Sequence, residues 1–154
     1  MVEFSLVAMG GTFDIIHKGH LALLDKAFSI SDDVIIGLTG DDLATKKGKK
    51  LNHTYSQRLY TLKKTIAEKF QNKSYTISKL DNDFGPAVLE KDVQALVVSA
   101  ETEYQGDILN KMRKEKNLTP VKIVTVSMVL ARDGKRISST RIRNSEIDTQ
   151  GNLV

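Results

Sequence analysis

The chain of 154 residues contains no cysteine, which excludes disulfide bonds and zinc sites with thiolate ligands. It also contains no apolar run near the roughly 20 residues that are needed to cross a bilayer. The first residues, MVEFSLVAMGG, include an early glutamate and end on two glycines, so we expect a first strand there and no signal peptide. These absences favour a cytoplasmic protein that has no membrane partner.

The sequence has only three histidines, His17, His20 and His53, which leave little material for a metal site. The first two stand three residues apart, whereas the two histidines of a zincin helix stand four apart. No cysteine can complete a zinc site, and the Walker motif GxxxxGK[ST] is missing as well. We therefore expect no metal ligands from the protein.

Acidic residues nearly balance the basic ones, because 23 lysines and arginines stand against 19 aspartates and glutamates, for a net charge of +4. So small a surplus does not require nucleic acid as a partner, but it suits a ligand with several phosphates if the charge is focused. Much of it is local, in KKGKK at residues 46–50 and RDGKRISSTRIR at residues 132–143. No aromatic residues interleave with KKGKK, so we expect no nucleic-acid surface there.

Short β-branched runs alternate with amphipathic helical patterns along the chain. The second, fourth and fifth runs are almost continuously apolar, which is typical of strands buried on both faces of a parallel sheet. Thr54 and Gln57 have the spacing of a capping box, which predicts where one helix begins. We predict a single-domain, Rossmann-like α/β fold with a doubly wound five-stranded parallel sheet in the order 3-2-1-4-5 and helices on both faces. The expected strands cover residues 4–9, 34–39, 74–80, 96–99 and 121–126, and the expected helices cover 20–28, 55–70, 106–116 and a last one from about 138–140.

We assign residues 1–147 to this domain. The remaining residues, DTQGNLV at 148–154, are expected to form a disordered tail. A protein of this length can be a monomer, and the sequence leaves the oligomeric state open.

The stretch MGGTFDIIHKGH, residues 9–20, follows the first expected strand. Gly10 and Gly11 have no side chains to keep phosphates from the backbone, and we expect their amides and that of Thr12 to form an anion-binding nest. His17 and His20 flank the start of the next helix, whose positive end attracts anions. The stretch has no nucleophile paired with a base, which suits phosphoryl or nucleotidyl transfer in which the substrate itself attacks. A plain tight turn is the alternative for two glycines after a strand.

The stretch RISSTRIR, residues 136–143, offers a second anion site. Ser138, Ser139 and Thr140 provide hydroxyl and amide donors at an expected helix start. The arginines at 136, 141 and 143 add positive charge nearby. The alternative is an ordinary helix cap followed by a basic, solvated helix face.

GTFD-x-x-H-x-G-H near the N-terminus and ISSTRIR near the C-terminus resemble the nucleotidyltransferase superfamily of the HxGH type. Within it, the chain is similar over nearly its whole length to the phosphopantetheine adenylyltransferases of the archaeal kind. The resemblance implies transfer of AMP from ATP to 4′-phosphopantetheine, giving dephospho-CoA and pyrophosphate in coenzyme A biosynthesis, with Mg²⁺ held mainly by the ATP phosphates. Bacterial relatives carry an arginine-glycine-rich segment after the fourth strand, where this chain has VVSAETEYQGD at residues 97–107, as in the archaeal and eukaryotic pattern.

The resemblance also implies roles for individual residues. Thr12 would orient the attacking phosphate, His20 would donate to the α-phosphate, and His17 would contact the nucleotide phosphates. A lysine after the second strand assists transfer in this superfamily, and we favour Lys46 or Lys47. The residues implied to bind ATP are Gly10, Gly11, Thr12, His17, His20, Ser99, Glu101, Ser138, Ser139, Thr140 and Arg141, with Thr102 beside them.

Some choices stay open. Asp14 is expected to hydrogen-bond within its own loop and not to bind metal. The acceptor pocket could include Phe84, Tyr104 and Met128. Other HxGH enzymes, namely cytidylyltransferases and FAD or NAD synthetases, carry similar motifs, and a non-catalytic nucleotide-binding module is the alternative from a different class.

Overall fold

The computed structural model describes residues 3–82, 84–85 and 92–154. In that part of the chain, five parallel strands form one sheet in the order β3-β2-β1-β4-β5, as predicted. β2 begins three residues earlier than expected because Ser31 and Asp33 already pair with Phe4 and Leu6. The strands are β1 (Phe4–Gly11), β2 (Ser31–Thr39), β3 (Ser74–Leu80), β4 (Ala95–Ser99) and β5 (Lys122–Val126).

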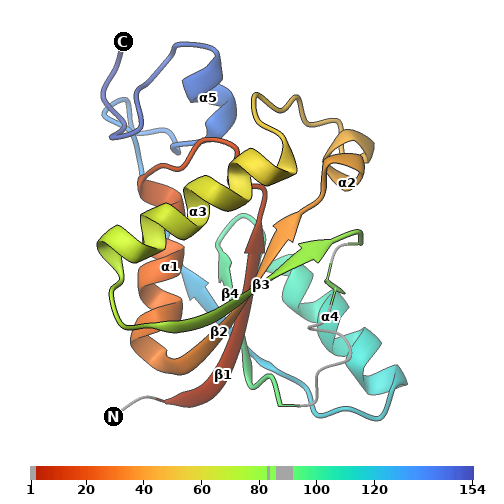
Figure 1. Ribbon diagram of the computed structural model, residues 1–154. Helices are drawn as coiled ribbons and strands as arrows, with labels where there is room; N and C mark the ends of the chain where they lie inside the picture. The colour runs from red at the N-terminus through yellow and green to blue at the C-terminus, as the bar shows by residue number, and fades with distance from the viewer. Residues whose placement is uncertain (1–2, 83, 86–91) are drawn as a thin grey trace.

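Helices cover both faces of the sheet, as the buried strands predicted (Figure 1). On one face, α1 (Lys18–Ile30) and α3 (Tyr55–Lys69) pack Leu24 and Leu62 into one apolar cluster with β1, β2 and β4. On the other face, α4 (Tyr104–Glu115) packs Leu109 against Ala8 and Val98. The apolar core therefore packs against both faces of the sheet, and a third, smaller cluster contains Ala131, Ile137 and Ile147.

Two short helices lie beyond the carboxyl ends of the strands, at the end of the molecule toward which β1 and β2 point (Figure 1). They are α2 (Asp41–Lys46) and α5 (Ser139–Arg143). The sequence predicted α5 but not α2, which buries only Ala44 and so shows no apolar stripe. No helix in the described residues has the length and apolar character needed to cross a membrane.

The predicted capping box fixes the start of α3. The Thr54 hydroxyl accepts from the amide of Gln57 at 3.3 Å, and the Gln57 side chain accepts from the amide of Thr54 at 2.9 Å. Two of the orphan amides at the helix start are thereby satisfied.

The end of the chain contradicts the expected disorder of residues 148–154. Asp148 organises a turn, because its carboxylate accepts from the amides of Gln150 and Asn152, each at 2.9 Å. Gly151 closes the turn with a φ of 84°, a left-handed conformation that glycine adopts without strain. Its carbonyl accepts from the amide of Arg132 at 2.9 Å, so the segment packs onto the domain.

Candidate functional site

A cavity of about 670 Å³ opens at the carboxyl edge of the sheet. One wall is formed by the loop after β1 and the first turn of α1, and another by the segment around the start of α5. The two motifs from opposite ends of the sequence therefore meet at one cavity. The predicted site residues that line it are Gly10, Gly11, Thr12, His17, His20, Ser99, Glu101, Ser138, Ser139 and Thr140, together with Thr102.

Hydrogen bonds join the two motifs directly. Ser139 Oγ donates to the carbonyl of Ile15 at 3.1 Å and accepts from the amide of Ile15 at 3.4 Å. Four residues further on, the Arg143 guanidinium forms an ion pair with the buried carboxylate of Asp14. Protein contacts alone therefore hold α5 beside the loop at 12–17.

Asp14 connects three segments. Its carboxylate accepts from the amides of Asn52 at 3.1 Å and His53 at 3.0 Å, in addition to the ion pair with Arg143. Burial alone would raise the pKa of this carboxyl, but the hydrogen bonds from Asn52, Arg143 and His53 lower the pKa below its ordinary value. We expected Asp14 to bond within its own loop. That expectation is wrong, because the loop turns the carboxylate inward and its partners lie on two other segments.

His17 and His20 form an unusual capping box at the start of α1. His17 Nδ1 accepts from the amide of Gly19 at 3.0 Å, and His20 Nδ1 accepts from the amide of His17 at 3.3 Å. The rings are stacked, with centroids 3.9 Å apart. An imidazole that accepts through Nδ1 carries its hydrogen on Nε2. Both rings line the cavity.

Both imidazoles are neutral at physiological pH. Burial, aided by the charge of Arg136, lowers the pKa of His17 to about 4. Burial also lowers the pKa of His20 to about 3, with further contributions from His17 and Lys49 that the carbonyl of Ile15 partly offsets. These rings therefore act as hydrogen-bond donors and not as general acids.

The glycines of the first motif allow close packing within the protein at the edge of the cavity. Gly10 and Gly11 continue β1 and pair with Gly37 and Leu38 of β2, and both line the larger cavity, so the anion nest expected from their amides stays a prediction. A Cβ at Gly10 would lie 3.2 Å from the Gly37 carbonyl oxygen, and one at Gly11 would lie 2.9 Å from the Phe13 ring. The left-handed residue of the turn is Phe13, with a φ of 51°.

The hydroxyl cluster is arranged as the helix start that the sequence predicted. Ser138 is the N-cap of α5, and its Oγ accepts from the amide of Arg141 at 3.1 Å. The Thr140 hydroxyl accepts from Arg143 Nη2 at 3.2 Å. Both Ser138 and Thr140 can still donate their hydroxyl hydrogens to an anion.

Arg141 does not line the cavity, contrary to the role that the resemblance implied. Its guanidinium forms ion pairs with Asp133 and Glu146 and donates to the carbonyl of Arg136 at 2.9 Å. Arg136 and Arg143 line the cavity instead, together with Lys49 and Lys50. A helical turn carries residues 141 and 143 to different sides, which the sequence pattern alone did not separate.

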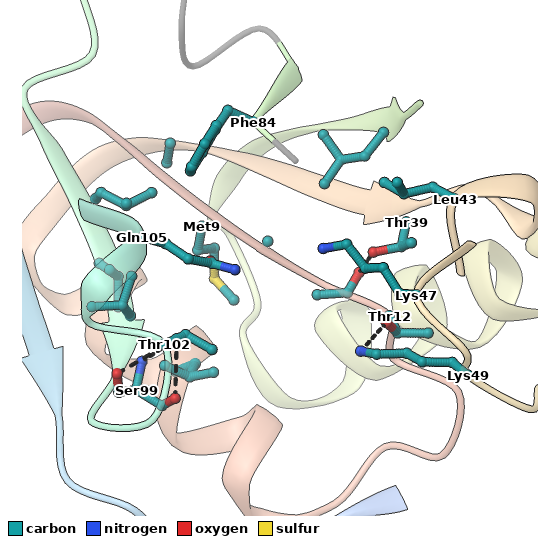
Figure 2. Close-up of a pocket in the computed structure, with 18 residues that line it drawn as sticks. Met9, Thr12, Thr39, Leu43, Lys47, Lys49, Phe84, Ser99, Thr102 and Gln105 are labelled. Atoms are coloured by element: carbon teal, nitrogen blue, oxygen red, sulfur yellow. Dashed lines mark hydrogen bonds between the residues drawn. The ribbon is translucent and has the colours of Figure 1, made fainter. Parts of the chain in front are cut away.

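A smaller cavity of about 150 Å³ adjoins Thr12, between the ends of β1, β2 and β4 (Figure 2). Lys49 lines both cavities and donates from Nζ to Thr12 Oγ1 at 2.9 Å. Lys47 lines the smaller cavity, whereas Lys46 is exposed and lines neither. Burial, with the neighbouring charge of Lys47, lowers the pKa of Lys49.

The lysine that contacts Thr12 is thus Lys49, and of the two lysines that we favoured, Lys47 lines the smaller cavity and Lys46 lines neither. α2 takes up residues 41–46, so the chain returns toward β1 only after that helix. The sequence did contain signals for this helix. Its first turn is acidic, with Asp41 and Asp42, and its last turn is basic, with Lys46.

The segment after β4 contributes to both cavities. Thr102 Oγ1 lies 3.1 Å from Ser99 Oγ and accepts from the Ser99 amide at 3.2 Å, so these two residues brace the turn (Figure 2). Glu101 forms an ion pair with Arg136 at 2.6 Å. Its carboxylate therefore links the loop after β4 to the loop before α5.

The three residues considered for an acceptor pocket lie in different places. Phe84 lines the smaller cavity, and Met128 lines the larger one. Tyr104 is 61% exposed and lines neither.

Arg58 is a site residue that the sequence reasoning missed. It is fully buried on α3, and its Nη1 donates to the carbonyls of Thr12 at 2.9 Å and Thr39 at 2.7 Å. The sequence did contain a signal for this role. Arg58 lies three residues after Tyr55 and four before Leu62, so it falls on the buried face of the helix, where a charged side chain is unusual.

Within the described part of the chain, no group of three or more histidine, cysteine, aspartate or glutamate side chains is placed to hold a metal ion. The two acidic residues at the larger cavity already form ion pairs, Asp14 with Arg143 and Glu101 with Arg136. The site as a whole combines neutral imidazole donors, hydroxyls and cationic side chains. This arrangement stabilises charge on phosphate groups and requires no nucleophile from the protein.

Comparisons with known proteins agree with this geometry. A family model described as cytidylyltransferase-like matches residues 8–145. A phosphopantetheine adenylyltransferase of Methanothermobacter thermautotrophicus is 41% identical over 152 residues, which cover 99% of this chain and 91% of that protein. The enzyme of the same name from Pyrococcus furiosus is 40% identical over 159 residues, with 99% and 95% covered. A solved structure of a protein with unknown function from Archaeoglobus fulgidus superposes with a TM-score of 0.70 and 30% identity, covering 80% of this chain and 89% of that one.

Proposed function

Since the chain belongs to the cytidylyltransferase-like family and, within it, to the phosphopantetheine adenylyltransferases of the archaeal type, we propose that it transfers AMP from ATP to 4′-phosphopantetheine. The products are dephospho-CoA and pyrophosphate, in coenzyme A biosynthesis. The observation that carries the proposal is the meeting of the HxGH and ISST segments at one cavity, through the contacts of Ser139 with Ile15.

The chemistry needs no covalent help from the protein. A phosphate oxygen of phosphopantetheine attacks the α-phosphorus of ATP, and the bond from that phosphorus to the β-phosphate oxygen breaks as pyrophosphate leaves. The protein contributes by holding the two substrates in line and by stabilising the charge that develops on the phosphates.

The larger cavity suits the nucleotide. The Nε2–H groups of His17 and His20 would donate to its phosphates, with His20 at the α-phosphate where negative charge builds. Ser138 and Thr140 would donate to the β- and γ-phosphates. The Ser139 hydroxyl already bonds Ile15, so we assign to this residue the positioning of the segment and a backbone amide toward the phosphates.

The smaller cavity suits the phosphopantetheine acceptor. Thr12 stands where the two cavities meet, and its hydroxyl accepts from the Lys49 ammonium. This pair would orient the attacking phosphate and neutralise part of its charge. Apolar side chains, including Met9 and Phe84, line part of the smaller cavity and suit the uncharged pantetheine arm (Figure 2).

We propose that Mg²⁺ comes with ATP and is held mainly by its phosphates, because the acidic side chains at the larger cavity are already paired. A bound Mg²⁺ supplies neutralisation of phosphate charge. We also propose that the reaction takes place in the cytoplasm, where ATP is available.

The test is a substrate screen with purified protein. We expect pyrophosphate release with ATP and phosphopantetheine, together with a product of the mass of dephospho-CoA. Preference for CTP, or turnover only with flavin mononucleotide or nicotinate mononucleotide, would favour a cytidylyltransferase or an FAD or NAD synthetase. ATP binding without product from any acceptor would favour a non-catalytic module.

A further inference from the structure

The buried side chain of Arg58 lies behind the site, in the first turn of α3. All of its guanidinium nitrogens have partners: Nη1 donates to two carbonyls, Nε donates to the carbonyl of His53 at 3.2 Å, and Nη2 donates to Asp41 Oδ1 at 2.7 Å. The side chain has no exposed surface, and it lines neither cavity.

The carbonyls that Arg58 binds belong to three separate segments. Thr12 directly follows β1, Thr39 ends β2, and His53 precedes α3. One planar guanidinium therefore sets the mutual positions of three chain segments at the carboxyl edge of the sheet. Lysine could not do this, because an ammonium on a flexible stem lacks the fixed fork of donors.

Stability alone does not account for a guanidinium at this position. Apolar side chains of similar volume are often as stabilising as a buried ion pair, because the charges must be desolvated. An apolar residue could fill the space, but it could not hold three carbonyl oxygens.

The contact with Thr12 leads directly to the reacting groups. Arg58 holds the Thr12 carbonyl, and the hydroxyl of the same residue receives the Lys49 ammonium at 2.9 Å. The next residue, Phe13, has a left-handed φ of 51°, which is uncommon for a bulky side chain and is sustained by the surrounding contacts.

We propose that Arg58 is a positioning residue for the transfer step: by fixing the Thr12 peptide, it aims the Thr12 hydroxyl and Lys49 at the acceptor phosphate. This inference rests on the proposed function. It implies that loss of the guanidinium slows turnover and leaves ATP affinity nearly unchanged, because His17 and Ser138 contact the nucleotide from other segments.

The chain offers a matched control in Arg113. This second arginine is also fully buried, donates from Nε to the carbonyl of Thr119 at 2.9 Å, and lies on α4 across the sheet from α3, where it lines neither cavity. Arg58→Lys and Arg113→Lys make the same chemical change at sites of equal burial. Both are expected to lower the melting temperature.

The experiment compares the two variants by steady-state kinetics and by calorimetry with ATP. We expect Arg58→Lys to lower kcat about tenfold or more, on the order expected when a reacting group is misplaced, with the ATP Kd changed less than about twofold. We expect Arg113→Lys to keep kcat within about twofold. Equal kcat values for the two variants would overturn the proposal.

A double-mutant cycle with Thr12→Ala separates positioning of Thr12 from a general effect. If Arg58 acts through Thr12, then Arg58→Lys should lower kcat less than about threefold once the hydroxyl is absent. Fully multiplicative losses would overturn the proposal.

Should Arg58→Lys fail to fold, Asp41→Ala tests the same arrangement from the half-exposed partner of Nη2. We expect it to lower kcat at least threefold without a change in ATP Kd, and an unchanged kcat would overturn the proposal. A wild-type protein that makes no dephospho-CoA would instead refute the proposed function, so the two failures are distinguishable.

Discussion

Acidification is expected to weaken the fold through the two motif histidines. In the folded protein the pKa of His17 is lowered to about 4 and that of His20 to about 3, from an ordinary value of 6.5. The unfolded chain therefore binds protons between pH 7 and pH 5 that the folded protein does not bind. Stability must fall as the pH falls through this window.

The size of the effect follows from linkage. Each ring that stays neutral in the folded state lowers the free energy of unfolding by roughly 2 kcal/mol between pH 7 and pH 5, so the pair should lower it by about 4 kcal/mol. Asp14 does not contribute to the change between pH 7 and pH 5, because its pKa lies below the ordinary 3.8 and its stabilising effect is lost only at lower pH.

Urea denaturation at pH 7 and pH 5 measures this difference. The variant His20→Asn supplies the control, because an asparagine side chain can still accept from the His17 amide but cannot titrate in this range. We expect the variant to lose about 2 kcal/mol over the same interval, half the change of the wild type. The same substitution should lower turnover about 100-fold, because it removes the Nε2–H donor at the α-phosphate.

A wild-type stability that changes by less than about 1 kcal/mol between pH 7 and pH 5 would refute the assignment of neutral, buried rings. So would an equal change in the wild type and in His20→Asn.

Two further predictions concern the contacts that assemble the site. Lys49→Met should lower kcat at least tenfold by removing the cation at Thr12. Lys46→Met, at an exposed position outside both cavities, should keep wild-type kinetics. A larger loss of pyrophosphate release in Lys46→Met than in Lys49→Met would contradict the placement of Lys49. Asp14→Asn should reduce the free energy of unfolding by about 3 kcal/mol and raise the KM for ATP, because the buried ion pair with Arg143 is broken; urea denaturation that matches the wild type would contradict it.

The sheet could be predicted from local pattern because its central strands, β1, β2 and β4, are largely buried and therefore contain apolar runs. β4, ALVVS, is an example, and the helices between the strands carried clear apolar stripes. α2 could not be predicted in the same way, since a helix of 6 residues that buries only Ala44 leaves no periodic signal. The ordered turn at 148–154 depends on Asp148 and Gly151, whose effect comes from contacts with the rest of the domain.

Sequence-based prediction of the site worked where the chemistry depends on residue type. It failed where the chemistry depends on which residues lie close together in space. Imidazoles, hydroxyls and a helix start predicted His20 and Ser138 as anion ligands, and the structure places both residues at one cavity. Lys49 reaches Thr12 only because α2 displaces the loop. Arg58 acts through carbonyls of three separate segments, and no local pattern brings those segments together.

The glycines show the same limit. Two glycines after a strand suggested a phosphate nest, and the structure shows a second reason for a glycine, because Gly11 makes room for the ring of Phe13. A missing side chain reveals close approach, and only the fold shows whether a ligand or the protein itself approaches.

The most direct measurement is a crystal structure with a non-hydrolysable ATP analogue. We expect its triphosphate to span the larger cavity, with the α-phosphate at His20 Nε2 and the terminal phosphates at the hydroxyls of Ser138 and Thr140. A triphosphate that touches only one of these two segments, or that binds outside the cavity, would contradict the claim that both ends of the chain bind one nucleotide.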